Sequence, residues 1–102
     1  MPNTEIYYMY RDADNYKKHN IQILSGLCLP EYEARIRATL KDGEYFIPSV
    51  VGLPEDKYSG SDADHDFFEF CGLRETNAPA SLSLTIEEVV KRMESVKDWE
   101  NP

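Results

Sequence analysis

The chain has 102 residues, of which 41% are apolar, and its formal net charge is −8. This length leaves room for one hydrophobic core, so we expect a single domain over residues 1–102. The acidic balance argues against direct binding to nucleic acid or to an anionic membrane surface, because both need a basic face. It favours a basic protein as the partner.

The first quarter of the chain predicts a β-hairpin. Residues 5–10 are aromatic and β-prone, and apolar side chains on both faces indicate a central strand. Residues 11–19 are polar and predict a long loop. Residues 21–24 (Ile-Gln-Ile-Leu) predict the second strand, which the chain leaves near Ser25.

The remaining elements are two helices and two extended segments. A helix is predicted over residues 30–42, because apolar residues recur every four positions and Gly43 follows as a stop. Residues 44–54 are apolar but broken by two prolines, so any strand there is short or lies at a sheet edge. Residues 66–74 alternate loosely and predict a third strand.

The second helix has the clearest signals in the chain. It is predicted over residues 85–97, where Thr85 and Glu88 have the spacing of a capping box. Its apolar stripe consists of Ile86, Val89, Val90, Met93 and Val96. We expect Trp99 to fold back onto the core. Together these elements predict an α+β domain, with an antiparallel or mixed sheet of three to four strands and two helices packed on one face.

The segment from Pro54 to Glu75 has seven acidic and two basic residues, and therefore carries −5 of the net charge of −8. Within it, acidic and aromatic side chains alternate. This pattern suits a surface that meets a basic, partly apolar partner, and it also keeps an edge strand soluble. The residues that we predict to form the partner surface are Asp62, Asp64, His65, Asp66, Phe68 and Glu69.

The same segment offers an alternative function as a metal-binding module or a small metal-dependent enzyme. Asp62, Asp64, His65 and Glu69 supply the carboxylate and imidazole ligands that divalent ions accept. The calcium loop of an EF-hand is excluded, because Phe67 and Leu73 occupy the positions that require glycine and glutamate.

No other constellation predicts catalysis. Cys28 and Cys71 each lie beside apolar residues, so we interpret both as unpaired, small, buried hydrophobes. His19 follows two lysines in the predicted loop, a solvated setting rather than a water-excluding catalytic pocket. We therefore expect no cofactor and no turnover by the isolated protein. The amino terminus lacks the basic and apolar regions of a signal peptide, which predicts a cytoplasmic protein.

Several stretches are similar to those of a group of short, uncharacterised bacterial and phage proteins. They are residues 7–17 (Tyr-Tyr-Met-Tyr-Arg-Asp-Ala-Asp-Asn-Tyr-Lys), residues 42–48, residues 52–54 and residues 64–70. The resemblance spans most of the chain. It implies a small soluble prokaryotic or phage protein, and it implies no activity and no site residues.

The leading hypothesis from the sequence is therefore a small acidic interaction module. It would act on a basic protein surface as a regulator, as a neutralising partner or as an inhibitor that mimics nucleic acid. A structural alternative is a homodimer joined along an edge strand.

Overall fold

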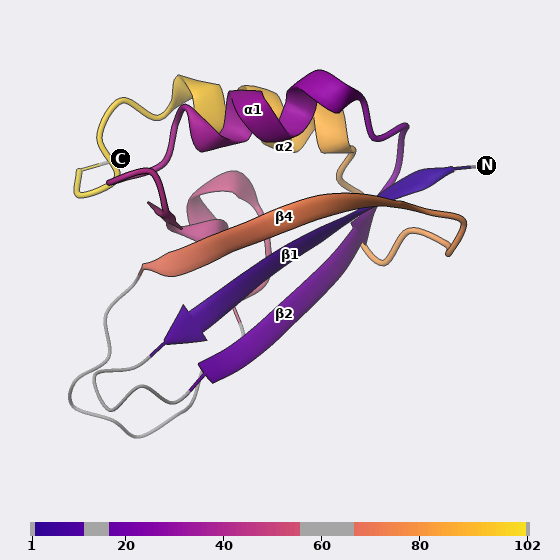
Figure 1. Ribbon diagram of the computed structural model, residues 1–102, viewed down its shortest axis with the longest axis horizontal. Helices are drawn as coiled ribbons and strands as arrows, with labels where there is room; N and C mark the ends of the chain where they lie inside the picture. Colours follow the sequence, from indigo (N-terminus) through magenta and orange to yellow (C-terminus); the bar gives the residue numbers. More distant parts are fainter. Residues whose placement is uncertain (1, 12–16, 56–66, 102) are drawn as a thin grey trace.

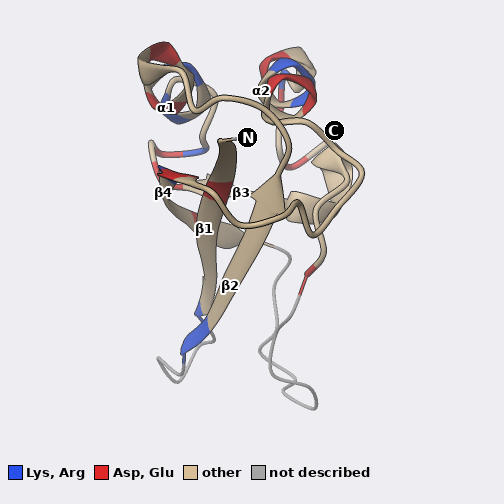
Figure 2. Cartoon of the chain, turned by 90° about the vertical axis from the view of Figure 1, so that its right-hand side faces the viewer, with Lys and Arg blue, Asp and Glu red and all other residues tan. Residues whose placement is uncertain are grey.

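The computed structural model describes residues 2–11, 17–55 and 67–101. The elements are β1 (Asn3–Arg11), β2 (Lys17–Leu24), α1 (Pro30–Arg37), β3 (Tyr45–Phe46), a short 3-10 helix η1 (Pro48–Val51), β4 (Phe68–Thr76) and α2 (Ile86–Ser95). The strands form one antiparallel sheet in the order β2-β1-β4-β3. Both helices lie on the same face of this curled sheet (Figures 1 and 2). The predicted α+β class is confirmed.

Strand β1 is the central strand that the sequence predicts, between β2 and β4. Its even-numbered side chains face the helices and are almost inaccessible to solvent; they are Thr4, Ile6, Tyr8 and Tyr10. Its partner β2 runs antiparallel from Leu24, opposite Thr4, to Lys17, opposite Arg11. The hairpin is thus confirmed. The loop predicted over residues 11–19 is wrong at Arg11 and at residues 17–19, which lie in strands because polar residues are tolerated at a sheet edge, where one side faces water. Residues 12–16 lie outside the described residues.

Strand β4 pairs with β1 through a β-bulge. Tyr7 lies opposite Gly72 and Tyr8 opposite Phe70, so Cys71 is the extra residue. The bulge is tied to α1, because the Leu73 N–H donates to the Glu33 carboxylate at 3.0 Å. Gly72 has φ +154°, and a Cβ at this position would lie 3.3 Å from the same carboxylate. Glycine therefore suits both the backbone and the close approach of α1.

Helix α1 ends at Arg37, so the predicted end at residue 42 is wrong. Turns replace the helix after Arg37, and Asp42 and Gly43 both adopt positive φ, at 54° and 75°. Leu40 nevertheless remains buried at 8% exposure. The apolar spacing was therefore a correct signal for burial but not for helix length.

Helix α2 confirms its sequence signals. The Glu88 N–H donates to the Thr85 hydroxyl at 3.0 Å, and the Thr85 N–H donates to the Glu88 carboxylate at 3.2 Å. Its buried residues are Ile86, Val89, Val90 and Met93. An ion pair joins the two helices, because Arg35 donates to both carboxylate oxygens of Glu94 at 3.0 and 2.6 Å.

The core lies between the helices and the sheet. Trp99 returns to it as predicted: the side chain is 4% exposed and its indole N–H donates to the Thr39 carbonyl at 2.7 Å. The ring also packs edge-on against Phe46 of β3. The proline-broken segment forms only the two-residue edge strand β3 and η1, as its prolines indicate. Within the described ranges, no helix is long and apolar enough to cross a membrane.

Candidate interaction surface

The structure places two of the six residues that we predicted to form the partner surface. Asp62, Asp64, His65 and Asp66 lie outside the described residues, whereas Phe68 and Glu69 begin strand β4. Successive residues of a strand point to opposite faces, so these two side chains are separated by the sheet.

Phe68 faces the helices and is completely buried. Its ring lies 5.9 Å from the Tyr8 ring and 5.2 Å from the Tyr10 ring, measured between centroids. Because a partner cannot reach this side chain in the folded chain, its assignment to the partner surface is wrong. The alternation of Phe68, Glu69 and Phe70 reflects a strand with one buried face.

Glu69 lies on the opposite face, where it pairs with a base. The Nε of Arg11 donates to the Glu69 carboxylate at 2.9 Å, and the two side chains are 39% and 22% exposed. This hydrogen bond raises the pKa of Arg11. The ion pair locally cancels the charge of Glu69, which makes this residue a weaker attractor for a basic partner than its position in the acidic segment indicates.

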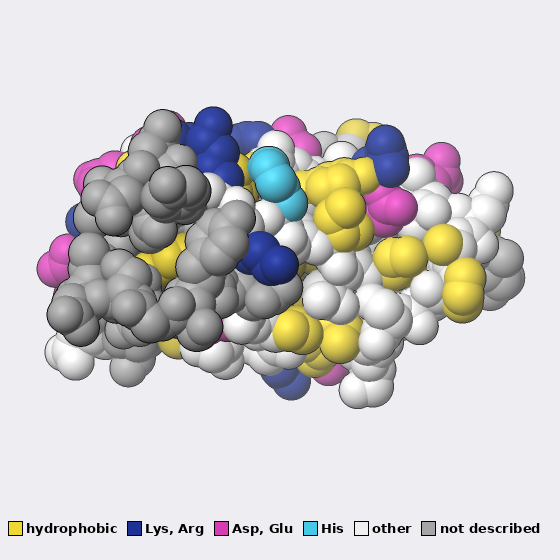
Figure 3. Space-filling model, turned by 90° about the horizontal axis from the view of Figure 1, so that it is seen from below, with side chains coloured by type: hydrophobic (Ala, Val, Ile, Leu, Met, Phe, Trp, Pro, Cys, Tyr) yellow, Lys and Arg dark blue, Asp and Glu magenta, His cyan; other side chains and the backbone are white. Residues whose placement is uncertain are grey.

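The face of the sheet that carries Glu69 is not covered by the helices (Figures 2 and 3). Register places the odd-numbered residues of β1 and β2 there. Apolar side chains gather on it (Figure 3). Register assigns Tyr7, Met9, Ile21 and Ile23 to this face, and of these Met9 is buried at 8% exposure whereas Ile21 is 52% exposed. We call these four residues the open-face strip. The alternation in β1 predicts that Tyr7 and Met9 share this face. That Ile21 and Ile23 lie on the same face follows only from the register between β1 and β2.

An acid–phenol–guanidinium cluster borders the open-face strip. The Tyr7 hydroxyl and the Arg74 guanidinium both donate to the Glu5 carboxylate, and Arg74 lies over the Tyr7 ring at 5.2 Å. These hydrogen bonds, first from Tyr7 and then from Arg74, lower the pKa of Glu5. The bond to Glu5 raises the pKa of Tyr7. The group is therefore a closed, charge-neutral arrangement that fixes β1 against β4.

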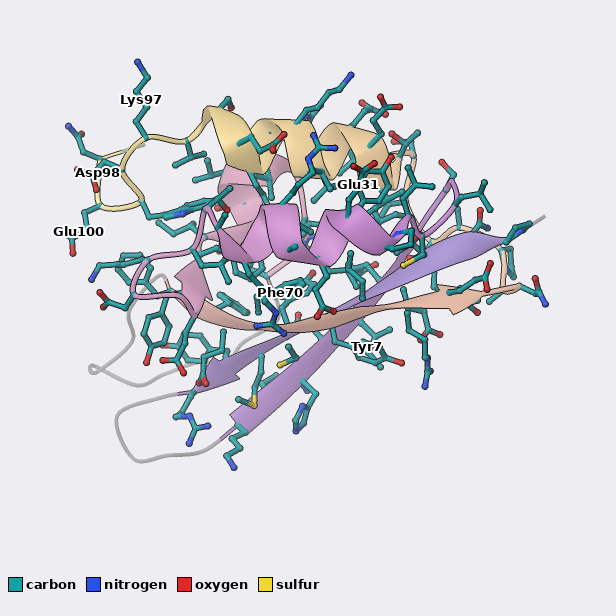
Figure 4. All side chains as sticks on the ribbon, turned by 45° about the horizontal axis from the view of Figure 1, so that its top comes forward. Tyr7, Glu31, Phe70, Lys97, Asp98 and Glu100 are labelled. Atoms are coloured by element: carbon teal, nitrogen blue, oxygen red, sulfur yellow. The ribbon has the colours of Figure 1, made fainter. Side chains whose placement is uncertain are left out.

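Phe70 of β4 and Tyr7 of β1 lie on opposite faces of the sheet. Figure 4 shows Phe70 on the side of the sheet that faces the helices and Tyr7 on the opposite side. Phe70 is 5% exposed, and Arg37 of α1 lies 5.0 Å from its ring centroid. Tyr8 and Tyr10 are also core residues, and the Tyr8 hydroxyl donates to the Pro54 carbonyl at 2.6 Å.

A shallow cavity of about 230 Å³ lies beside the start of β4, lined by Lys41, Asp42, Tyr45 and Phe67. Lys41 pairs with Asp42 at 3.4 Å and with Glu100 at 3.1 Å, so the lysine already has two acidic neighbours. The nearby Glu44 carboxylate raises the pKa of Tyr45. Tyr45 and the ion-paired Lys41 both stay protonated and supply hydrogen-bond donors, and Asp42 is the one carboxylate among these four lining residues.

The described residues contain no group of three metal-ligating side chains. Of the candidate metal ligands, Glu69 is the one that the structure places, and it pairs with Arg11. Both cysteines are free. Cys28 is half-buried and Cys71 is exposed at the bulge, so our interpretation of Cys71 as a buried hydrophobe is wrong. Desolvation raises the pKa of both thiols, which disfavours the reactive thiolate.

No family model, no curated protein and no solved structure matches this chain.

Proposed function

We propose that the protein is a small acidic interaction module that binds a basic surface of another protein. Its biological role would be that of a regulator, a neutralising partner or an inhibitor that occupies a basic groove in place of nucleic acid. One observation carries this proposal, namely the uneven distribution of the excess negative charge along the chain.

The described part of the chain is nearly balanced in charge. Residues 12–16 and 56–66 contain six of the nineteen acidic residues and one of the eleven basic residues. These two ranges therefore carry −5 of the net charge of −8. The described helices instead carry acids and bases side by side (Figure 2), and Arg35 of α1 pairs with Glu94 of α2 at 2.6 Å.

The strand ends that border the two acidic ranges lie at one end of the sheet. Arg11 ends β1, Lys17 begins β2 directly opposite it, and Phe68 begins β4 near the same end of β1. Lys17 and Lys18 are basic, and Arg11 and Glu69 cancel. With these four residues counted, the two ranges and their strand ends carry −3 over 20 residues, against −5 over the remaining 82 residues of the chain. We call this end of the sheet the acidic end.

Charge concentrated at one end of a small domain steers a partner of opposite charge. It speeds association by long-range attraction and orients the encounter, and both effects fall with ionic strength. Acids that are paired with a base, such as Glu94 with Arg35, contribute less to steering because the neighbouring base offsets their charge. A basic groove that normally holds nucleic acid is one surface with the required charge.

The proposal is tested with two double variants that change the net charge equally. Asp64→Lys with Asp66→Lys removes charge from the acidic end. Glu31→Lys with Glu75→Lys is the matched control, since both glutamates are exposed in the described structure and belong to α1 and to the far end of β4. Glu31 is labelled on the helix layer in Figure 4.

Wild type and both variants are used as baits in the native cell extract, and the association rate of each captured protein is then measured with purified components. We expect the Asp64/Asp66 variant to associate at least about tenfold more slowly and the Glu31/Glu75 variant to keep most of the wild-type rate. Equal slowing in both variants would show that association depends on the total charge and not on the position of the acidic residues, which would contradict the proposal. Unchanged rates in the Asp64/Asp66 variant would remove the acidic end from the interface.

A further inference from the structure

The shallow cavity beside β4 lies at the acidic end of the sheet. Two of its lining residues, Lys41 and Asp42, lie in the turns after α1, while Tyr45 belongs to β3 and Phe67 directly precedes β4. Lys41 and Tyr45 exchange two backbone hydrogen bonds, at 2.8 and 2.9 Å. The turn and the strand that form the cavity are therefore held against each other by the backbone.

Two aromatic rings contribute to the lining of this cavity. The ring of Phe67 already faces a cation, because the Nζ of Lys41 lies 5.5 Å from its centroid. Tyr45 is half-buried, and among the described residues no cation lies over its ring. A cavity of about 150 Å³ holds one benzene molecule. The volume of about 230 Å³ here has room for the end of one long side chain.

Lys41 is shared by two carboxylates at the rim of the cavity. It pairs with Asp42 at 3.4 Å and with Glu100 at 3.1 Å, so the three residues together carry −1. Asp42 and Glu100 are 71% and 63% exposed, whereas Lys41 is 32% exposed. A charged group that approaches from solvent therefore meets the acids before it meets the lysine.

Further carboxylates lie around Tyr45. The Glu44 carboxylate raises the pKa of Tyr45 most, and burial of the phenol comes second. Glu69 and Asp42 raise it further. Arg11 is also near Tyr45, but it pairs with Glu69 at 2.9 Å. Glu44, Glu69 and Arg11 together add another −1, which gives these six charged residues around the cavity a net charge of −2.

We propose that the cavity receives one arginine side chain of the basic partner, with its guanidinium stacked on the Tyr45 ring and paired with the Asp42 carboxylate. The identity of the occupant rests on the proposed function, and the inference adds which side chain enters and where. A negative cavity with an aromatic wall selects a cation. Arginine suits it better than lysine, because its planar group stacks on a ring and pairs with a carboxylate at the same time.

Lys41 limits how tightly this cavity holds a second cation. It repels the incoming charge and occupies part of the attraction of Asp42 and Glu100. Lys41→Met removes the charge and keeps an apolar chain of similar length against Phe67. Arginine binding should therefore become tighter in this variant, whereas mere damage to the cavity would make it weaker.

The test is a titration of the full chain, followed by the amide signals in nuclear magnetic resonance spectra. The probe is a capped Gly-Arg-Gly peptide, added to about 50 mM because a single side chain binds weakly. The matched control is the same peptide with citrulline, which keeps the shape of arginine without its charge. Sodium chloride holds the ionic strength equal in both titrations. We expect the shifts to concentrate at Asp42, Tyr45 and Phe67 and to be at least about threefold larger with arginine.

Three variants locate the binding site. Asp42→Asn removes the carboxylate, and asparagine tolerates the φ of 54° at this position. Glu31→Gln is the matched control, because it removes the same charge from an exposed residue of α1. We expect Asp42→Asn to weaken arginine binding at least about threefold, Lys41→Met to tighten it by a similar factor, and Glu31→Gln to leave it unchanged.

An equal response to the citrulline peptide would overturn the inference, and so would shifts that lie away from the cavity. Wild-type affinity in Asp42→Asn or weaker binding in Lys41→Met would also overturn it. The titration needs no captured partner, so its failure is distinct from failure of the proposed function. Slow association of the Asp64/Asp66 variant without arginine binding would reject the cavity alone. Arginine binding with an unchanged association rate would reject the acidic end alone.

Discussion

Shortening one buried valine in α2 measures how firmly the helix layer is docked on the sheet. Val90 is completely buried, and the change to alanine removes the equivalent of two methylene groups. The lost transfer free energy is about 1.6 kcal/mol at about 0.8 kcal/mol for each group. Any space that stays empty adds to this cost, and relaxation of neighbours reduces it, so the expected loss is about 1–3 kcal/mol.

The chain offers a matched control for this change. Val50 in η1 is 38% exposed, and Val50→Ala should alter the free energy of unfolding by less than about 0.5 kcal/mol. Both variants are compared with wild type by urea unfolding, followed by far-UV circular dichroism and by the fluorescence of Trp99. Coincident transitions by the two probes establish two-state behaviour. A Val90→Ala variant within about 0.3 kcal/mol of wild type would refute the docking of α2 described above.

Two further predictions concern α2. Thr85→Ala should cost about 1 kcal/mol of stability in the same urea assay, because it removes the hydroxyl that accepts the Glu88 N–H, while Thr85→Ser should recover most of the loss. The hydrogen bond from Arg35 lowers the pKa of Glu94 below its usual value of 4.5, so the unfolded chain takes up this proton first as pH falls. The stabilisation is therefore present above about pH 4.5 and is lost below it. Glu94→Gln should flatten this acid limb of the stability curve, and an unchanged limb would show that the ion pair is not formed.

Local chemistry explains which parts of the fold could be predicted. Helix α2 follows its signals closely, because the capping box at Thr85 fixes its start and the apolar stripe fixes its buried face. The return of Trp99 follows from the cost of leaving a large apolar ring in water. The β1–β2 hairpin follows from two β-prone runs separated by polar residues.

The errors arise because strand pairing decides which face of the sheet a residue occupies, and this pairing cannot be read from the local sequence. Nothing local distinguishes an aromatic residue on a buried strand face from one on a partner surface, and so Phe68 was assigned to the wrong side. The bulge at Cys71 moves every later residue of β4 to the opposite face from the one that simple alternation predicts. No residue type in this stretch predicts the bulge. The strand residues Lys17 and His19 resemble a loop because the edge and outer face of β2 are open to water.

The candidate site was predicted only in outline. The sequence locates the concentration of acid in residues 54–75, but the pairing of Glu69 with Arg11 depends on the contact between two strands far apart in the chain. The same holds for the near-neutral described surface, on which pairs such as Arg35 with Glu94 join different elements. The sequence shows which residues are charged, whereas the fold determines which acidic residues form ion pairs with basic ones.

The central claim is that the acidic end recruits a basic partner by charge. Its most direct test is the association rate of wild type with its captured partner at ionic strengths from about 0.05 to about 0.5 M, where the screening length falls from roughly 14 to roughly 4 Å. We predict that the rate falls by at least about tenfold across this range, while the dissociation rate changes little. An association rate that is the same at both ends of the range would contradict the claim.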